Sequence, residues 1–292
     1  MLKLIFFRLY NVYYHIYIME LIYKLPTVVK GYVVKRPSAH CKTPYVADVL
    51  LEDGTTVMAH SAALGCCGLC DAGANVLMIP VTNPKNVCKY KIMLAQQTER
   101  DEVRYIGTDP KLAETLVDLC LQKSLVFGLD SIQSYKREQK KLNSRFDFAG
   151  FDKTNKEFVL EVKNVPLADY EDITAKERKT KDYSTCSIRE KLSYFPDGYR
   201  KKKGDVVSPR ALKHIQELAY LVEHENIRAC LCFVIQRNDA NRFQPSVLDP
   251  TYRKAVQEAV KVGVEIKTLQ LEWREDGSCY FLSNQLPVLL DN

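Results

Sequence analysis

The first third of the chain contains short runs of hydrophobic residues separated by turn residues. The runs are rich in β-branched and aromatic residues, which is typical of short β-strands. Asp53 and Gly54 between two of the runs form a hairpin signal. About five or six short strands over this length predict a small barrel, for which an OB-like barrel is the natural candidate. The runs cover residues 27–35, 45–51, 56–60, 75–81 and 90–97.

The pattern changes after residue 108, where helical and strand periodicities alternate. Asp-Pro or Ser-Pro pairs mark the starts of segments whose apolar residues recur at helical spacing. The segment 229–235 is apolar throughout, as expected for a central strand that is covered on both faces. This alternation predicts an α/β (α+β) architecture, with a mixed sheet flanked by helices. The expected helices begin at 110, 209 and 250, and the other expected strands cover 145–151, 157–165 and 264–273.

These patterns predict two domains, an OB-like domain over 19–108 and an α/β domain over 109–292. A polar stretch at about 167–207 has almost no apolar periodicity, and we expect a solvated or disordered insertion there with at most a short helix. The stretch contains two basic clusters, at 176–181 and 200–203. Such clusters bind polyanions, although many serve only solubility.

Composition indicates an ordinary globular protein, because the 292 residues are 46% hydrophobic and 27% charged. The net charge of +6 is compatible with a polyanionic partner. Ten cysteines without the spacing of a disulfide framework predict free thiols and a cytoplasmic protein. Charges such as Arg8 interrupt the apolar start of the chain, so we expect no membrane span. We interpret residues 1–18 as an extension that is disordered or not native, with Met19 as the start.

The most informative local feature is an acid in one apolar strand followed by an acid and a lysine in the next. Because alternate side chains of a strand share a face, Glu161 and Lys163 should project together. Turn residues at 152–155 would bring Asp147 near them. This set suits a metal-dependent phosphodiesterase, in which the carboxylates hold Mg²⁺ or Mn²⁺ and the lysine positions water or phosphate. The alternative is an exposed Glu–Lys pair without function, worth about 0–1 kcal/mol.

Further motifs surround this set, and their order and most of their spacings match a known protein family. They are Ser144 to Phe148, Glu161 to Lys163, Phe195 to Asp197, Lys213-His214, Gln236 to Asp239, Asp249-Pro250, Gly263 to Glu265 and Leu286 to Val288. In these motifs the chain resembles the sugar fermentation stimulation protein family (SfsA), from roughly residue 19 to the C-terminus. The resemblance implies an OB-like domain followed by a restriction-endonuclease-like domain of the PD-(D/E)XK type. It also implies nucleic-acid binding and is compatible with nuclease chemistry.

The resemblance adds candidate residues around the central three. Glu138 matches an acidic position of the family, and we expect it at the end of a helix, where nucleases of this class add a carboxylate to the metal. The alternative for Glu138 is an exposed residue among lysines and arginines. For Lys213 and His214, on the flank of a predicted helix, the alternative is a solvated helix face. The candidates for contact with nucleic acid are Arg145, Lys201, Lys202, Lys213 and His214.

The sequence therefore predicts a nucleic-acid-binding protein with a divalent-metal-dependent phosphodiesterase site, and DNA is favoured over RNA as the partner. A non-catalytic DNA-binding regulator that retains the nuclease-like fold is the alternative, and metal-dependent digestion of DNA and RNA would separate the two. A third possibility is an OB-type module for a protein or small ligand. In that case the affinity for nucleic acid should be weak and should change little with salt.

Overall fold

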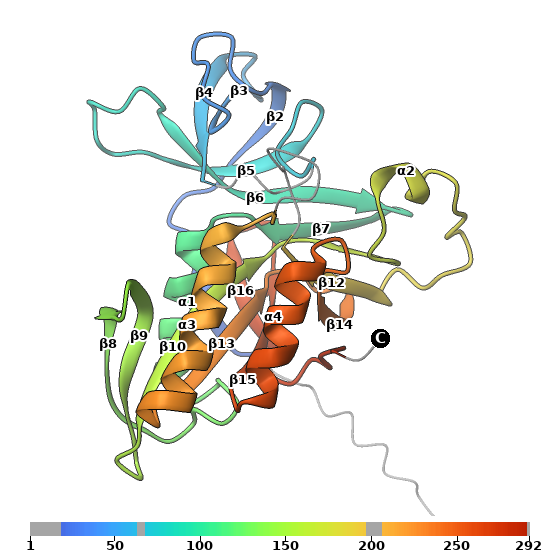
Figure 1. The fold of residues 1–292 in the computed structure, drawn as a ribbon. Coiled ribbons are helices and arrows are strands. Elements are labelled where there is room, and N and C mark those ends of the chain that lie inside the picture. The colour runs from blue at the N-terminus through green and yellow to red at the C-terminus, as the bar shows by residue number, and fades with distance from the viewer. Residues whose placement is uncertain (1–18, 63–67, 197–205, 291–292) are drawn as a thin grey trace, which may run out of the picture.

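The structure is a computed structural model that describes residues 19–62, 68–196 and 206–290 (Figure 1). Residues 1–18, which we interpreted as an extension, lie outside the described part. One continuous sheet runs from a small barrel into a larger mixed sheet. Among the residues described, no helix is long and apolar enough to cross a membrane.

The first part of the chain forms a small barrel, as the short strand patterns predicted. Its strands follow the order β4-β3-β2-β5-β6, and a parallel pairing of β4 with β6 closes the barrel. The interior is apolar and includes the fully buried Val33, Val49, Met78 and Ile92. The strands are β2 (Val29–Lys35), β3 (Val46–Leu51), β4 (Thr56–Ser61), β5 (Asn75–Pro80) and β6 (Tyr90–Glu99).

A mixed sheet continues from the barrel through the hairpin of β6 and β7. Strand β7 pairs with β15, and the order continues β15-β13-β10-β9-β8. Strands β10, β13 and β15 are parallel, whereas β8, β9 and β10 are antiparallel. The short β1 precedes the barrel in sequence and pairs with β16 at the mixed part of the sheet. These strands are β1 (Leu21–Lys24), β7 (Glu102–Gly107), β8 (Ile132–Lys141), β9 (Ser144–Asp152), β10 (Glu157–Val165), β13 (Arg228–Ile235), β15 (Glu265–Trp273) and β16 (Ser278–Ser283).

Helices cover both faces of the mixed sheet, with α1 on one face and α3 and α4 on the other (Figure 1). The buried strand β13 serves both sides, because Cys232 lies in the core under α1 and Phe233 in the core under α3 and α4. The predicted α/β architecture and its three Pro-marked helices are therefore confirmed. The helices are α1 (Pro110–Gln122), α3 (Pro209–Glu225) and α4 (Pro250–Lys261), capped by the side chains of Asp109, Ser208 and Asp249.

The polar stretch after β10 is more ordered than its composition predicts. It contributes β11 (Ala168–Asp169), α2 (Ala175–Arg178) and β12 (Lys191–Phe195), and β12 pairs with β14 (Ala240–Pro245) in a second, smaller sheet. The expectation of a solvated segment is wrong for β12, which is largely buried. The polar sequence did not indicate burial, because the charge of Lys191 is neutralised by ion pairs with Glu99 and Asp239 and can therefore be buried. Lys201 and Lys202 of the second basic cluster lie outside the described residues.

The cysteines in the described part are free thiols, as their spacing predicted. Cys120, Cys230 and Cys232 pack in the core between α1 and the mixed sheet. Burial raises the pKa of the Cys120 and Cys230 thiols to about 12. These side chains are therefore neutral at physiological pH and contribute apolar packing.

Candidate functional site

Strands β9 and β10 separate at the point where the candidate acids lie. Their ladder ends with Leu160 opposite Phe148. Just beyond this pair, Asp147 Oδ2 accepts a hydrogen bond from the N–H of Val162 at 2.7 Å. The carboxylate therefore occupies the opening between the two strands and takes a backbone donor of β10.

Glu161, Lys163 and His214 meet beside this opening. Lys163 Nζ and His214 Nδ1 both contact Glu161 Oε1, and the two nitrogens lie 3.4 Å apart. The ion pair confirms that Glu161 and Lys163 project from the same face of β10. His214, which we expected on the flank of its helix, is buried and only 4% exposed. It can be buried because the carboxylate of Glu161 satisfies Nδ1 and Phe146 packs 5.8 Å from its ring.

The two carboxylates differ in their affinity for a proton. Burial raises the pKa of Asp147 to about 7, and the negative charge of Glu161 adds to the increase. Burial also acts to raise the pKa of Glu161, but the charge of Lys163 and the hydrogen bond to His214 outweigh it, so this pKa lies below its ordinary value. At neutral pH Glu161 is therefore ionised, whereas Asp147 is partly protonated. Paired carboxyl groups whose environments push their pKa values apart are typical of functional sites.

One oxygen of Glu161 is buried without a hydrogen-bond partner, namely Oε2. Such an oxygen is costly unless a cation or a donor satisfies it. Within the described ranges, no group of three or more His, Cys, Asp or Glu side chains is assembled to hold a metal ion. The fit to a hard divalent cation therefore rests on Asp147 and Glu161, which offer oxygen atoms of the preferred type. Further ligands would come from water or a third carboxylate.

Glu138 lies on strand β8, so its expected place at the end of a helix is wrong. Its backbone has a φ of 55°, and its carboxylate lies 2.7 Å from both Lys111 Nζ and Arg145 Nε. The sequence of β8 is polar because this strand forms one end of the mixed sheet, where β9 is its sole neighbour among the described strands. Polar residues on such an edge strand do not show the apolar alternation that would have identified it.

The helical acid that influences Asp147 is Glu114 of α1, which sequence reasoning missed. Its negative charge contributes to the raised pKa of Asp147. Its carboxylate contacts Lys111 and lies 3.5 Å from Arg137 Nη2. The sequence signal that could have identified Glu114 is its position beside the apolar stripe of a predicted helix, next to the buried Ala113.

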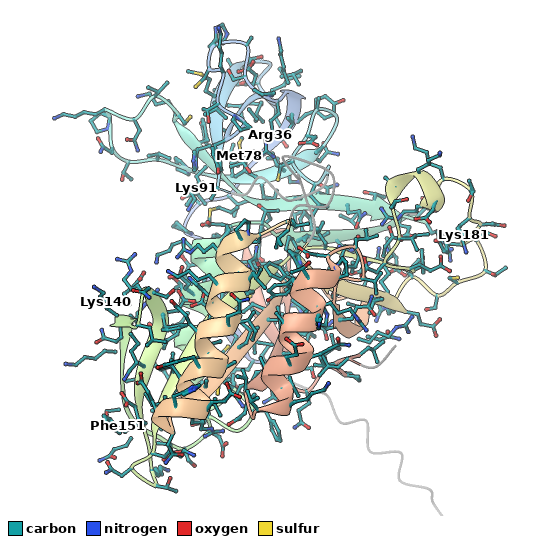
Figure 2. The ribbon with its side chains drawn as sticks, viewed as in Figure 1. Arg36, Met78, Lys91, Lys140, Phe151 and Lys181 are labelled. Atoms are coloured by element: carbon teal, nitrogen blue, oxygen red, sulfur yellow. The ribbon has the colours of Figure 1, made fainter. Side chains whose placement is uncertain are left out.

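Exposed cations flank the opening. Arg145 lies on β9 two residues before Asp147 and is 65% exposed while it pairs with Glu138. Lys213 precedes His214 on α3 and donates a hydrogen bond to the carbonyl oxygen of Asn143 at 2.7 Å. Lys140 lies directly across the β8–β9 hairpin from Arg145 and projects from it (Figure 2). The hairpin and the first turns of α3 therefore present a group of positive charges.

Comparison with known proteins places this fold in a family. A family model described as "Sugar fermentation stimulation protein RE domain" matches residues 111–176 and 184–277. A "Sugar fermentation stimulation protein homolog" from Alteromonas mediterranea is 30% identical over 274 residues, which cover 91% of this chain and 98% of that protein. This chain belongs to the sugar fermentation stimulation protein family. A homolog from Jannaschia sp. is 31% identical over 226 residues, which cover 76% of this chain and 81% of that protein.

The fold of the sugar fermentation stimulation family is also found among solved structures. "The structure of Pyrococcus Furiosus SfsA in complex with Ca2+" matches with a TM-score of 0.73 at 19% identity, and the match covers 92% of this chain and 99% of that one. At this identity the likeness shows the fold alone. The family resemblance read from the motifs is confirmed, and so is the order of a small barrel followed by a mixed sheet with helices.

The metal-free protein should lose stability as the pH rises through the range in which Asp147 titrates. The pKa of Asp147 rises from 3.8 to about 7 on folding, so the folded state binds the proton more tightly than the unfolded state. The free energy of unfolding should therefore fall between pH ~4 and pH ~7, by at most about 4 kcal/mol. In Asp147→Asn, the amide oxygen can still accept from Val162, and no charge is buried.

Denaturant unfolding in the presence of a chelator measures this effect. Asp147→Asn should be more stable than wild type above pH ~7, by roughly 1–3 kcal/mol, and equally stable near pH ~4. The same dependence on pH in both proteins would contradict the assignment of the raised pKa to Asp147.

Proposed function

We propose that this protein is a divalent-metal-dependent phosphodiesterase that acts on nucleic acid, with DNA as the favoured substrate. The observation that carries the proposal is the half-buried Asp147 in the opening between β9 and β10, next to Glu161 with its unpartnered Oε2. Lys163 supplies one positive charge to this acidic pair. Two carboxylates and a lysine are the groups that hydrolysis of a phosphodiester requires at a metal site.

Asp147 and Glu161 would hold the ion, and Mg²⁺ or Mn²⁺ are the cations we propose. The ion would supply Lewis-acid activation of the phosphate and a lowered pKa for a bound water. Glu114 is the candidate for a third carboxylate, because its negative charge contributes to the raised pKa of Asp147, and it would have to leave Lys111 and Arg137 to reach an ion. Glu138 is held by Lys111 and Arg145 and would have to leave them to reach an ion. The solved relative from Pyrococcus furiosus is described as a Ca²⁺ complex, which supports a site of oxygen ligands.

Lys163 would act on the phosphate. Its side chain is only 12% exposed, and a positive charge in such a desolvated position stabilises a developing negative charge more strongly than in water. In the described structure its Nζ is bound to Glu161 Oε1. A substrate phosphate would compete for donors of the same ammonium group, which has three.

The exposed cations beside the opening and the exposed residues of the barrel would bind the nucleic-acid chain. Arg145 and Lys213 lie next to the opening and would contact backbone phosphates. On the barrel, Tyr32 and Leu50 are directly opposed on β2 and β3 and are 43% and 36% exposed. An exposed aromatic ring on a barrel strand can stack on a base. The free thiols in the described part support our proposal of a cytoplasmic location.

A non-catalytic DNA-binding regulator is the second candidate. It is favoured by one observation, namely that the described residues do not assemble three metal-ligating side chains. Digestion of single- and double-stranded DNA and RNA, with Mg²⁺ or Mn²⁺ and with chelator, separates the two. Cleavage that requires the metal supports the phosphodiesterase, whereas binding without cleavage under all these conditions supports the regulator.

Arg145→Ala and Lys213→Ala should each weaken binding to an oligonucleotide several-fold. Each change removes one phosphate contact, so the slope of log affinity against log salt should become shallower by about 1. Fluorescence anisotropy at several salt concentrations measures both quantities. Lys254→Ala is the control, because this α4 lysine is 75% exposed and outside the proposed contact. Unchanged slopes for both site variants would contradict the proposed binding surface.

A further inference from the structure

His214 occupies a position on α3 where an apolar residue would be expected. It lies on the buried face of the helix together with Ala211, Ile215, Leu218 and Leu221. Its ring packs against Phe146 at 5.8 Å. A buried imidazole needs a hydrogen-bond partner, and the partner of Nδ1 is Glu161. The side chain is therefore held in the core, and the contact of Nδ1 with Glu161 fixes the orientation of its ring.

The contact between His214 and Glu161 determines which groups donate. Glu161 is an ionised carboxylate and can only accept, so His214 Nδ1 carries the proton of this hydrogen bond. The ammonium of Lys163 has donors and no acceptor, so it too donates to Glu161. Both donors contact the same oxygen, Oε1, which brings their nitrogen atoms to 3.4 Å from each other.

The result is an asymmetric carboxylate. Oε1 of Glu161 has two donors, and Oε2 is buried with none. Rotation of the carboxyl group would move Oε1 away from both donors, so His214 and Lys163 together resist it. Lys163 is a long and flexible side chain with a proposed task on the phosphate, whereas His214 is anchored in the core. His214 is thus the donor that can hold Glu161 in place while Lys163 moves.

We propose that His214 is a positioning residue that holds Glu161 through Oε1, so that Oε2 is directed at a divalent cation shared with Asp147. The inference rests on the proposed function and names a second residue that sets the metal affinity of the same site. Hydrogen bonds from outside a metal site fix the orientation of its ligands, and their loss typically weakens metal binding about 10- to 100-fold. His214 therefore acts on the cation without contacting it.

The test compares three substitutions at this position by titration calorimetry with Mn²⁺ alone. His214→Ala removes the donor, and we expect Mn²⁺ to bind about 10- to 100-fold more weakly. His214→Asn places an amide N–H near the position of Nδ1, so its affinity should stay within about threefold of wild type. His214→Gln carries its amide one carbon further along and should resemble His214→Ala. Circular dichroism and unfolding midpoints show that each variant is folded.

The outcomes distinguish this inference from the proposed function. Rescue by Asn but not by Gln supports positioning through Nδ1, and this comparison still decides the matter if His214→Ala does not fold. Wild-type Mn²⁺ affinity in both His214→Ala and His214→Gln would overturn the inference while leaving the metal site intact. Equal losses in His214→Asn and His214→Gln would also overturn it, because a merely structural role of the ring predicts them. No Mn²⁺ binding by the wild type would overturn the proposed function and this inference with it.

Discussion

Asp147→Asn should reduce metal-dependent cleavage by on the order of a thousandfold while leaving nucleic-acid binding nearly unchanged. The substitution removes the negative charge that would hold the cation but keeps an oxygen for the N–H of Val162. The loss reflects several kcal/mol of transition-state stabilisation that the cation would otherwise supply. Cleavage rates with Mg²⁺ or Mn²⁺, and anisotropy of a bound oligonucleotide in chelator, measure the two effects separately.

Glu157→Gln is the matched control for this prediction. Glu157 lies on β10, four residues before Glu161, and its carboxylate pairs with Lys141 at 2.7 Å. It is a partly exposed acid of the same strand outside the proposed site, so its removal should leave the cleavage rate unchanged. Full activity of Asp147→Asn in a preparation free of other nucleases would reject Asp147 as a ligand.

Asp239→Ala should lower the free energy of unfolding by about 3–5 kcal/mol, because it leaves buried positive charges without their partner. Asp239 is fully buried, and Arg237 reaches its two oxygens at 2.6 and 2.7 Å. Lys191 lies 3.3 Å and Arg104 3.8 Å from the same carboxylate. Arg237 also donates to Gln97 of β6 at 3.0 Å. The cluster therefore ties the β6–β7 hairpin to the smaller sheet, and its loss should loosen that connection.

The control for Asp239 is Asp276→Ala, which removes an ion pair of a different kind. Asp276 and Lys24 are each 56% exposed, so their ion pair contributes only about 0–1 kcal/mol. Asp276 also accepts hydrogen bonds from the N–H and Oγ of Ser278, so we expect a total change of about 1–2 kcal/mol, which is still below that of Asp239→Ala. Denaturant unfolding at neutral pH compares the two variants with wild type. Equal, small effects would contradict the importance assigned to the buried cluster.

The same cluster has a defined dependence on pH. Burial acts to raise the pKa of Asp239, but the charge and hydrogen bonds of Arg237 outweigh it and lower the pKa to about 2. The stability that Asp239 contributes is present above its unfolded pKa of ~4 and is lost as the pH falls toward ~2. The free energy of unfolding should therefore fall less between pH ~4 and pH ~2 in Asp239→Ala than in wild type.

Local signals in the sequence were sufficient for most of the fold. Each Pro-marked helix begins where a preceding Asp or Ser accepts a hydrogen bond from the first turn, an interaction between residues two or three positions apart. Short apolar runs predicted the strands of the barrel, and longer apolar runs predicted the strands of the mixed sheet. Both predictions were possible because the apolar positions of a strand reflect which of its faces are buried. The acid–acid–lysine set was also accessible, since alternation along β10 places Glu161 and Lys163 on one face.

What the sequence did not reveal depends on partners far apart in the chain. Lys191 appeared to belong to a solvated segment, but Glu99 and Asp239 neutralise it in a buried strand. His214 appeared to lie on a helix flank, but Glu161, 53 positions away, allows it to be buried. Arg237 and Asp239 belong to a family motif, but the sequence did not indicate what they do. The structure shows that they form an ion pair within one buried cluster. Pairings of this kind leave no periodic trace in the sequence.

The central claim is that Asp147 and Glu161 hold one divalent cation between them. Anomalous diffraction from a crystal soaked with Mn²⁺ tests it most directly. The claim predicts a single strong peak within about 2.6 Å of both the Asp147 carboxylate and Glu161 Oε2. Occupied Mn²⁺ sites elsewhere on the protein, with no peak between these two carboxylates, would contradict it.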